Sequence, residues 1–539
     1  MMQILKTITL ALIILLMACN PNLDPMEGVT LKVDTRVANS SVSMMFVDAV
    51  TGEPITSDIR VSISGEGSDN IYDISGLKQN AYTAKNGFLT LAIISLDEIS
   101  QSNKINFVIE GDIAGYIPIS RTYSFDKESH EAVQFKMINI ENPDNLPEGI
   151  EMSSESGQLI DGVVQDTIKY SLHSSSSNTN MDITIPAGMV MKDANGVTLS
   201  GNIAVSTIYF NNEDDEALSA FPGGLNMTLK SASRAQSQGL MTTCGFTKID
   251  IVDESGRQAR FFSQGAVNIK MEVPAATLKP DGNQVMPGDE LISISRQEGE
   301  DAWDDEDEEI IMRGPLENGN LYIEDDITHL SYHNWGWFKE STCEKQTTEL
   351  IIKSETLSQA DYGQVNYEIR NNADQKLLKK GLLSFYYNTP ITIPVFEGPE
   401  VKLIIKNGDL QNCAHILDSL IISDMCSDVL EINMPTIENV LPEVRVVMEG
   451  TCASNPDLVV QPSLGFWYLN LDDPCASWQQ AYMEVGEVSL INVSVGATYQ
   501  VNAYIDDELK SNTVTVNSDS TEYFRHIALP ASICDMIGI

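Results

Sequence analysis

The sequence predicts an all-β protein in which antiparallel β-sandwiches follow one another along an elongated chain. Short segments such as 203–209 and 267–273 alternate apolar and polar residues, which is the period of a strand with one buried face. Clusters of Gly, Asn, Asp and Ser, which favour tight turns, separate these segments at short intervals. No long segment carries the 3.6-residue apolar period of an amphipathic helix. These three observations together favour sandwiches over mixed folds.

The first nineteen residues predict export and a lipid anchor. The apolar run 7–17 is too short to span about 30 Å of hydrocarbon at 1.5 Å per residue. The tetrapeptide Leu-Met-Ala-Cys that ends at Cys19 resembles the lipobox of bacterial lipoproteins, in which the cysteine becomes acylated. The resemblance implies a signal peptide over 1–18, lipid attachment at Cys19 and a tether over 19–28, with acyl chains holding the protein to a membrane. The alternative is an ordinary secretory signal with a cysteine by chance.

The charge of the chain restricts its partners. The sequence has 77 acidic and 33 basic side chains, a formal net charge of −44. Such a field repels phosphate backbones, so nucleic acid is excluded as a partner. It also disfavours contact with anionic lipid beyond an acyl anchor. Solubility at a crowded cell exterior is the simplest interpretation of this charge.

Residues 29–138 form the first predicted module. A strand ends in Asp-Ala-Val-Thr-Gly-Glu-Pro at 48–54, an Asn-Gly turn follows at 86–87, and Gly-Tyr-Ile-Pro stands at 115–118. This order resembles the carboxypeptidase regulatory-like fold, a small transthyretin-like sandwich. The resemblance implies a spacer or binding platform without catalytic residues. The proline-bearing segment 139–149 is predicted to be a linker.

Residues 150–342 form a larger predicted sandwich. Ile-Pro-Ala-Gly at 185–188 precedes Phe-Pro-Gly-Gly at 221–224, a Cys-Gly-Phe hairpin at 244–256 and His-Leu-Ser-Tyr-His-Asn at 329–334. This order is similar to the β-sandwich module of cartilage intermediate layer proteins and of many bacterial lipoproteins. The resemblance implies an architectural or interaction role.

The remaining chain is predicted to hold two Ig-like sandwiches, 343–436 and 437–539. Segment 395–407 aligns without gaps with segment 493–505, which indicates a divergent tandem repeat. Cysteines cluster here, and in an exported chain such clustering indicates disulfides, although spacing leaves their connectivity open. The candidate disulfide cysteines are Cys343, Cys413, Cys426, Cys452, Cys475 and Cys534.

Nothing in the sequence indicates catalysis. It lacks a Gly-x-Ser-x-Gly elbow, a P-loop and a dinucleotide fingerprint. Cys244 is interpreted as a buried structural thiol rather than a nucleophile. His329 and His333 lie in a strand-rich segment and are interpreted as sandwich-edge residues rather than metal ligands. We therefore expect neither an enzyme nor a cofactor.

Two groups of residues are weak ligand candidates. The acidic runs 213–216 and 301–309 could offer oxygens to calcium, but solvated loops are the preferred interpretation because consecutive carboxylates alternate sides on a strand. The calcium candidates are Asp304, Asp305 and Asp307. Exposed aromatic rings would stack on sugars or anchor a protein, whereas core packing is the default for them. The candidate binding aromatics are Trp335, Trp337 and Trp467.

These features predict a non-catalytic outer-membrane lipoprotein for display, adhesion or ligand binding, with its periplasmic or cell-surface face left open. Its partners would be a membrane, through the acyl chains, and a protein or glycan ligand. The two Ig-like modules are expected to lie farthest from the membrane. One alternative is a fimbria-type subunit or anchor, which would exchange a donor strand between copies. The other is a glycan-binding accessory of an outer-membrane uptake system.

Overall fold

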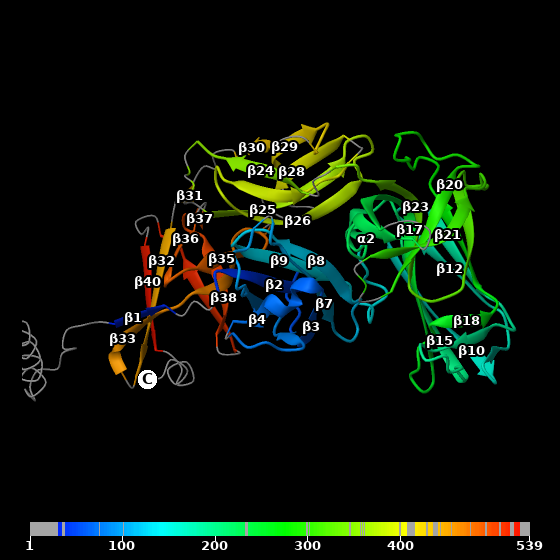
Figure 1. The fold of residues 1–539 in the computed structure, drawn as a ribbon, viewed down its shortest axis with the longest axis horizontal. Helices are drawn as coiled ribbons and strands as arrows, with labels where there is room; N and C mark the ends of the chain where they lie inside the picture. Colours follow the sequence, from blue (N-terminus) through cyan, green and yellow to red (C-terminus); the bar gives the residue numbers. More distant parts are fainter. Residues whose placement is uncertain are drawn as a thin grey trace, which may run out of the picture.

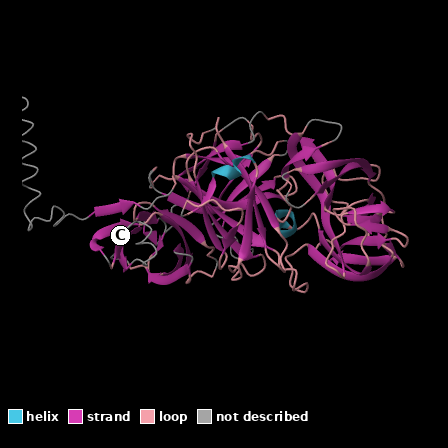
Figure 2. Cartoon of the chain, turned by 60° about the horizontal axis from the view of Figure 1, so that its bottom comes forward, coloured by secondary structure: helices cyan, strands magenta, loops and turns pink. Residues whose placement is uncertain are grey.

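The computed structural model confirms the all-β prediction (Figures 1 and 2). Within the described residues the helices are two five-residue turns, η1 (Glu66–Asn70) and α2 (Asp215–Ser219). No helix of the described part is long and apolar enough to cross a membrane. The description covers residues 31–528 except 35–37, 75, 101, 232–235, 298–299, 301, 344–346, 356, 358, 360–361, 398–399, 407–415, 427–428, 435–439, 442–443, 454, 475, 491–492, 506–507 and 518–521.

The first sandwich spans residues 40–137. One sheet has the order β4-β6-β2-β9 and the other β5-β3-β7-β8. Between them Phe46 stacks on Phe135 at 5.0 Å and Phe107 on Phe125 at 6.0 Å between ring centroids. Its strands are β2 (Ser40–Asp48), β3 (Ile59–Ser64), β4 (Ile71–Asp73), β5 (Tyr82–Ala84), β6 (Phe88–Ile93), β7 (Ile105–Asp112), β8 (Ile119–Phe125) and β9 (His130–Met137).

The Asn-Gly turn expected from the sequence joins β5 to β6. Asn86 and Gly87 have φ angles of 51° and 82°, as a tight hairpin turn requires. A Cβ on Gly87 would lie 2.7 Å from the carbonyl oxygen of Phe46, so only glycine fits there.

The second sandwich spans residues 150–340. Its ten-stranded sheet has the order β16-β21-β20-β23-β17-β15-β10-β11-β14-β18, and its four-stranded sheet β12-β13-β19-β22. One face of the large sheet packs on the small sheet, and the other contributes Phe210, Phe246 and Trp303 to a separate apolar cluster. Its strands are β10 (Ile150–Ile160), β11 (Val163–Val164), β12 (Ile168–Ser174), β13 (Thr179–Ile185), β14 (Val190–Lys192), β15 (Gly201–Phe210), β16 (Asn226–Lys230), β17 (Ser237–Asp253), β18 (Phe261–Gln264), β19 (Val267–Val273), β20 (Glu290–Arg296), β21 (Trp303–Ile311), β22 (Leu321–Ile327) and β23 (Tyr332–Glu340).

The third sandwich spans residues 347–433 and shares its core with the second. Its sheets have the orders β27-β24-β30 and β26-β25-β28-β29. Buried Leu350, Ile369 and Phe396 belong to the same apolar cluster as Phe246 and Trp303 of the second sandwich. Its strands are β24 (Thr347–Lys353), β25 (Tyr362–Asn371), β26 (Leu377–Tyr386), β27 (Pro390–Pro394), β28 (Val401–Lys406), β29 (Ile416–Ile422) and β30 (Leu430–Asn433).

The fourth sandwich spans residues 440–528 and also includes the first strand of the chain. One sheet has the order β1-β33-β32-β36, with β40 on the other side of β32, and the second sheet has the order β35-β34-β38-β39. A short β31–β37 pair accompanies them. The strands are β1 (Leu31–Asp34), β31 (Val440–Leu441), β32 (Val444–Cys452), β33 (Asn455–Gln461), β34 (Leu464–Asn470), β35 (Gln479–Met483), β36 (Glu487–Leu490), β37 (Val493–Ser494), β38 (Thr498–Ile505), β39 (Glu508–Thr515) and β40 (Glu522–Ala528).

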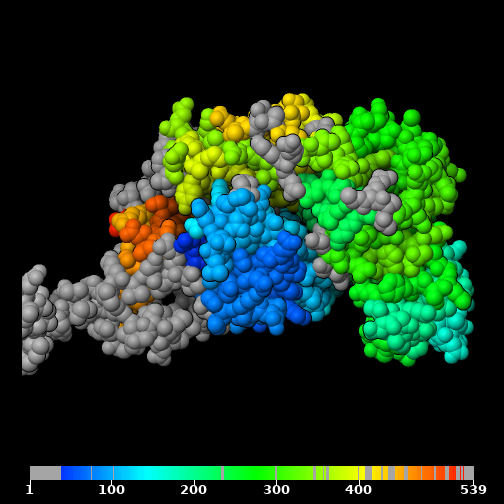
Figure 3. Space-filling model, in the orientation of Figure 1, coloured from blue at the N-terminus to red at the C-terminus, as the bar shows by residue number. Residues whose placement is uncertain are grey.

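The order of the modules in space differs from their order in sequence. Strand β1 pairs in parallel with β33, with Leu31 opposite Leu458, so the chain enters beside the fourth sandwich. Figures 1 and 3 show the fourth sandwich at one end, the first and third in the middle, and the second at the opposite end. An early strand therefore occupies the edge of a late sheet, whereas the last two modules were expected to lie far from the start of the chain.

Candidate functional sites at the module joints

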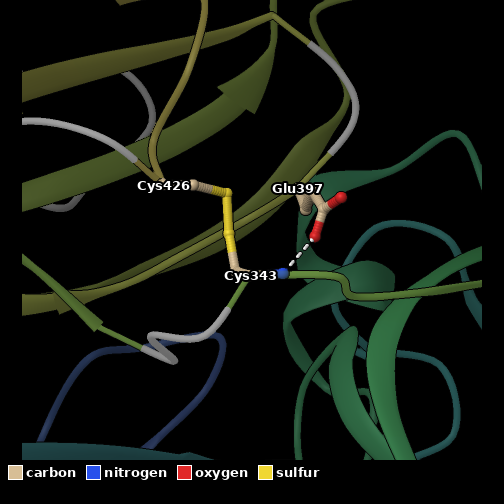
Figure 4. Close-up of side chains that lie close together, drawn as sticks. All are labelled: Cys343, Glu397 and Cys426. Atoms are coloured by element: carbon tan, nitrogen blue, oxygen red, sulfur yellow. Dashed lines mark hydrogen bonds between the residues drawn. A yellow bond between two sulfur atoms is a disulfide. The ribbon is translucent and has the colours of Figure 1, made fainter.

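A disulfide links the segment after the second sandwich to the third sandwich (Figure 4). Cys343, three residues beyond the end of β23, bonds to Cys426, which follows β29 and lies 83 residues later. Closing a loop of this length removes many conformations from the unfolded chain. Of the other candidate cysteines, Cys452 is also disulfide-bonded. Cys413, Cys475 and Cys534 lie outside the described residues.

The carboxylate of Glu397 holds the same segment. It accepts hydrogen bonds from the Thr342 hydroxyl at 2.6 Å, the Ser341 hydroxyl at 2.9 Å and the backbone N–H of Cys343 at 2.8 Å. These bonds, led by that from Thr342, lower the pKa of Glu397 to about 2. Cys343, Glu397 and Cys426 form the only group of three potential metal ligands in the described part of the chain. Both sulfurs are bonded to each other in the disulfide, however, so the group has a structural role and offers no thiolate to a metal.

The acidic run 213–216 is part of this joint and not a solvated loop. Glu213 pairs with Lys376 at 2.8 Å, Asp215 with Arg370 at 3.1 Å and Glu216 with Lys380 at 2.8 Å, so three carboxylates on and beside α2 meet three cations of the third sandwich. The solvated-loop interpretation failed because the partners lie more than 150 residues away in sequence.

The calcium candidates do not converge. Asp304, Asp305 and Asp307 lie on β21, where the Asp305 carboxylate accepts the backbone N–H of Asp307 at 3.0 Å. The Asp307 carboxylate accepts the Ser231 hydroxyl at 3.2 Å. Partial burial raises the pKa of Asp304. Each carboxylate therefore has its own surroundings, and they do not form a shared group of ligands within the described residues.

Of the two histidines singled out in the sequence, His333 is not at a sheet edge as expected. Strand β23, which carries His333, lies between β17 and β20. His333 is 1% exposed, and its Nε2 lies 3.1 Å from the carbonyl oxygen of His329. Burial lowers the pKa of His333 to about 3, because the charged ring would lose its hydration. His329 in turn contacts Glu306 at 3.1 Å, so the pair belongs to an interior polar network.

The candidate binding aromatics are engaged in packing. Trp335 is fully buried, and its indole N–H donates to Asp325 at 2.6 Å. Trp467 is buried where the first and fourth sandwiches meet, beside Trp478 and Phe88. Trp337 is half-buried, and its N–H donates to the Glu290 carbonyl at 2.8 Å. None of the three presents a free ring face.

Cys244 lies buried in the core of the second sandwich, as interpreted from the sequence. Its burial raises the pKa of the thiol to about 12. A thiol with this pKa stays protonated and is a poor nucleophile.

A cleft that the sequence did not reveal lies where the first, third and fourth sandwiches meet. Its volume is about 900 Å³, within the range of ligand sites. Residues 127–132, 382–392 and 482–489 supply most of its lining. No motif marked it, because it arises from three segments that are far apart in the chain.

Polar and aromatic groups line this cleft. The His130 ring stacks on Tyr482 at 3.5 Å between centroids, which joins the first sandwich to the fourth. Arg445 pairs with Glu487 at 2.6 Å. Burial raises the pKa of Glu131 to about 7. Tyr386 is 50% exposed and is the large aromatic side chain of the cleft that solvent reaches best.

Comparison with known proteins leaves the family of this chain open. No family model matches it, and no curated protein matches it. Among solved structures, the shaft pilin SpaA of Lactobacillus rhamnosus GG is 10% identical and aligns over 34% of this chain and 97% of its own, with a TM-score of 0.15. The major pilin subunit of Bacillus cereus is 5% identical over 91% and 98%, with a TM-score of 0.13. The Bacillus anthracis TIE protein is 8% identical over 71% and 75%, with a TM-score of 0.14. Scores this low carry no argument about function.

Proposed function

We propose that this protein is a non-catalytic lipoprotein of the outer membrane that displays a binding surface away from the bilayer. One observation carries the proposal. Strand β1, which follows Cys19 by a short segment, lies at the end of the molecule opposite the second sandwich. Acyl chains on Cys19 would therefore place the fourth sandwich next to the membrane and the second farthest from it.

The joint between the second and third sandwiches supports a display role. A disulfide, a carboxylate clamp and three ion pairs act on this one joint. The shared apolar cluster adds a continuous core across it. These contacts favour a rigid spacer over a flexible string of beads.

Membrane partitioning tests the anchor. In wild-type cells the protein should fractionate with membranes, and the Cys19→Ser variant should appear in the soluble fraction. Protease treatment of intact cells then tests the orientation. Cleavage within the second sandwich, with the fourth protected, is expected for surface display. Unchanged membrane partitioning of Cys19→Ser would disprove lipid anchoring.

A fimbria-type subunit is the second candidate, and the pairing of β1 favours it. This strand contributes to a sheet whose other members come from residues beyond 440, so a β1 strand from a neighbouring copy could take the same place. Deletion of residues 31–34 would then leave the fourth sandwich open to a synthetic β1 peptide. A truncated chain that neither binds this peptide nor assembles with full-length protein would exclude the role.

A further inference from the structure

The strands that border the three-module cleft all lie at the edges of their sheets. Strands β9, β26, β27, β35 and β36 each end a sheet and pair with one neighbouring strand within the described part of the chain. An edge strand presents a row of backbone N–H and C=O groups outside its own ladder. These edges surround one opening; the Gln480 N–H of β35 and the Pro390 carbonyl of β27 are taken by Gln364 and Lys127, which leaves the other edge groups as backbone partners for an added strand.

The space lined by strands β9 and β26 is larger at one end than at the other. Gln134 and Lys136 of β9 and Lys380 of β26 line a space of only about 60 Å³. Farther along the same two strands, residues 130–132 and 382–386 line the cleft of about 900 Å³. The larger space also borders β27 and β36. An added strand needs about 4.8 Å to each neighbour, so the larger space is the one that suits it.

The charges of the cleft favour a basic ligand. Its lining carries four carboxylates, Glu128, Glu131, Glu484 and Glu487, against two cations, of which Arg445 pairs with Glu487 and Lys127 donates to the Pro390 carbonyl at 3.1 Å. Glu128 and Glu131, by contrast, form no ion pair with any described residue. The net charge of −44 would add long-range attraction for the same kind of ligand.

We propose that this cleft binds an extended, basic segment of a partner protein, which adds to the sheet edges as a further strand. The proposal rests on the non-catalytic binding role proposed above. The edges would pair with the backbone of the segment, and Glu128 and Glu131 would contact its Lys or Arg side chains. The half-exposed ring of Tyr386 lies in the same lining. A neutral oligosaccharide could use the ring but would leave the edges unpaired.

Binding of a synthetic peptide tests the proposal on the mature chain at pH 8, above the raised pKa of about 7 of Glu131. The probe is a fluorescent peptide of about ten residues with alternating Lys and Thr, long enough for one strand. Its binding is measured by anisotropy. A matched probe carries N-methyl groups on alternate backbone amides, which preserves charge and side chains but prevents strand pairing. We expect the methylated probe to bind about tenfold more weakly or worse.

Two variants distinguish binding of the peptide by the carboxylates of the cleft from its attraction to the net negative charge of the protein. The double variant with Glu128→Gln and Glu131→Gln should weaken binding several-fold. Glu317→Gln, which removes an exposed carboxylate on the second sandwich, should leave it unchanged. Equal binding of both probes, or no effect of the double variant, would overturn the proposal. Displacement of the peptide by a neutral β-glucan oligosaccharide that binds the cleft more tightly would also overturn it and assign a glycan site. None of these results depends on Cys19, so a failure of lipid anchoring would be seen separately.

Discussion

The two places where sandwiches meet differ in what their side chains achieve. At the joint between the second and third sandwiches, opposite charges pair, a disulfide closes and one apolar cluster runs through. Where the first, third and fourth sandwiches meet, sheet edges face each other across an open cleft. The first joint is thus filled and paired, whereas the second leaves an open space lined by carboxylates and by edge strands.

The disulfide should contribute most to the closed joint. Replacing both cysteines, with Cys343→Ser and Cys426→Ser, is expected to lower the free energy of unfolding by about 2–5 kcal/mol, because the unfolded chain regains the entropy of a long open loop. Calorimetry of oxidised protein measures the shift in Tm. Faster proteolysis between residues 340 and 347 should accompany it. An unchanged Tm would show that the other contacts hold the joint alone.

A pair of arginines compares the two regions directly. Arg370 in the closed joint contacts Asp215 and Glu368 and is 16% exposed, whereas Arg445 at the cleft contacts Glu487 and Glu522 and is 42% exposed. Arg370→Met should cost about 1–3 kcal/mol, because the partly buried Asp215 loses its cation and Glu368 keeps only Lys406. Arg445→Met should change stability little, because solvent screens its pairs. Equal effects in urea unfolding would contradict the contrast between the joints.

Local features of this architecture were predictable from the sequence, but the joints were not. The Asn86–Gly87 turn and the alternating strands follow from local rules, because turn geometry and the strand period are decided by neighbouring residues. The joint depends on Asp215 meeting Arg370 across 155 residues, and the cleft depends on three distant segments. The parallel pairing of β1 with β33 is more distant still. No periodicity in a single sequence encodes such contacts.

Acid should weaken the closed joint. Glu397 has a lowered pKa of about 2, so its contribution to stability is present above its ordinary pKa near 4.5 and is lost as pH falls toward 2. The Tm of wild type should therefore fall between pH 4.5 and 2. In Glu397→Gln this part of the fall should disappear, because no proton is taken up at the position. If the Tm of wild type and that of Glu397→Gln fall in parallel, another group causes the acid sensitivity, and His333 is the first alternative.

At the cleft, Glu131 should make the Tm depend on pH in the opposite direction, with a loss of stability as pH rises. Glu131 has a raised pKa of about 7, so its contribution is present below pH 4.5 and is lost as pH rises through 7, when burial has to accommodate a charge. Glu131→Gln should therefore gain Tm relative to wild type at pH 8 and gain nothing at pH 4.5. The measured quantity is the Tm of Glu131→Gln minus the Tm of wild type, compared between pH 8 and pH 4.5. Glu317→Gln serves as the control. Should a basic peptide bind the cleft, the wild-type loss at pH 8 should shrink, because the ligand would add a cation to the one that Lys127 supplies. A gain that is the same at both pH values would mean that the Glu131 carboxyl is solvated, and the charge argument for the cleft would fall with it.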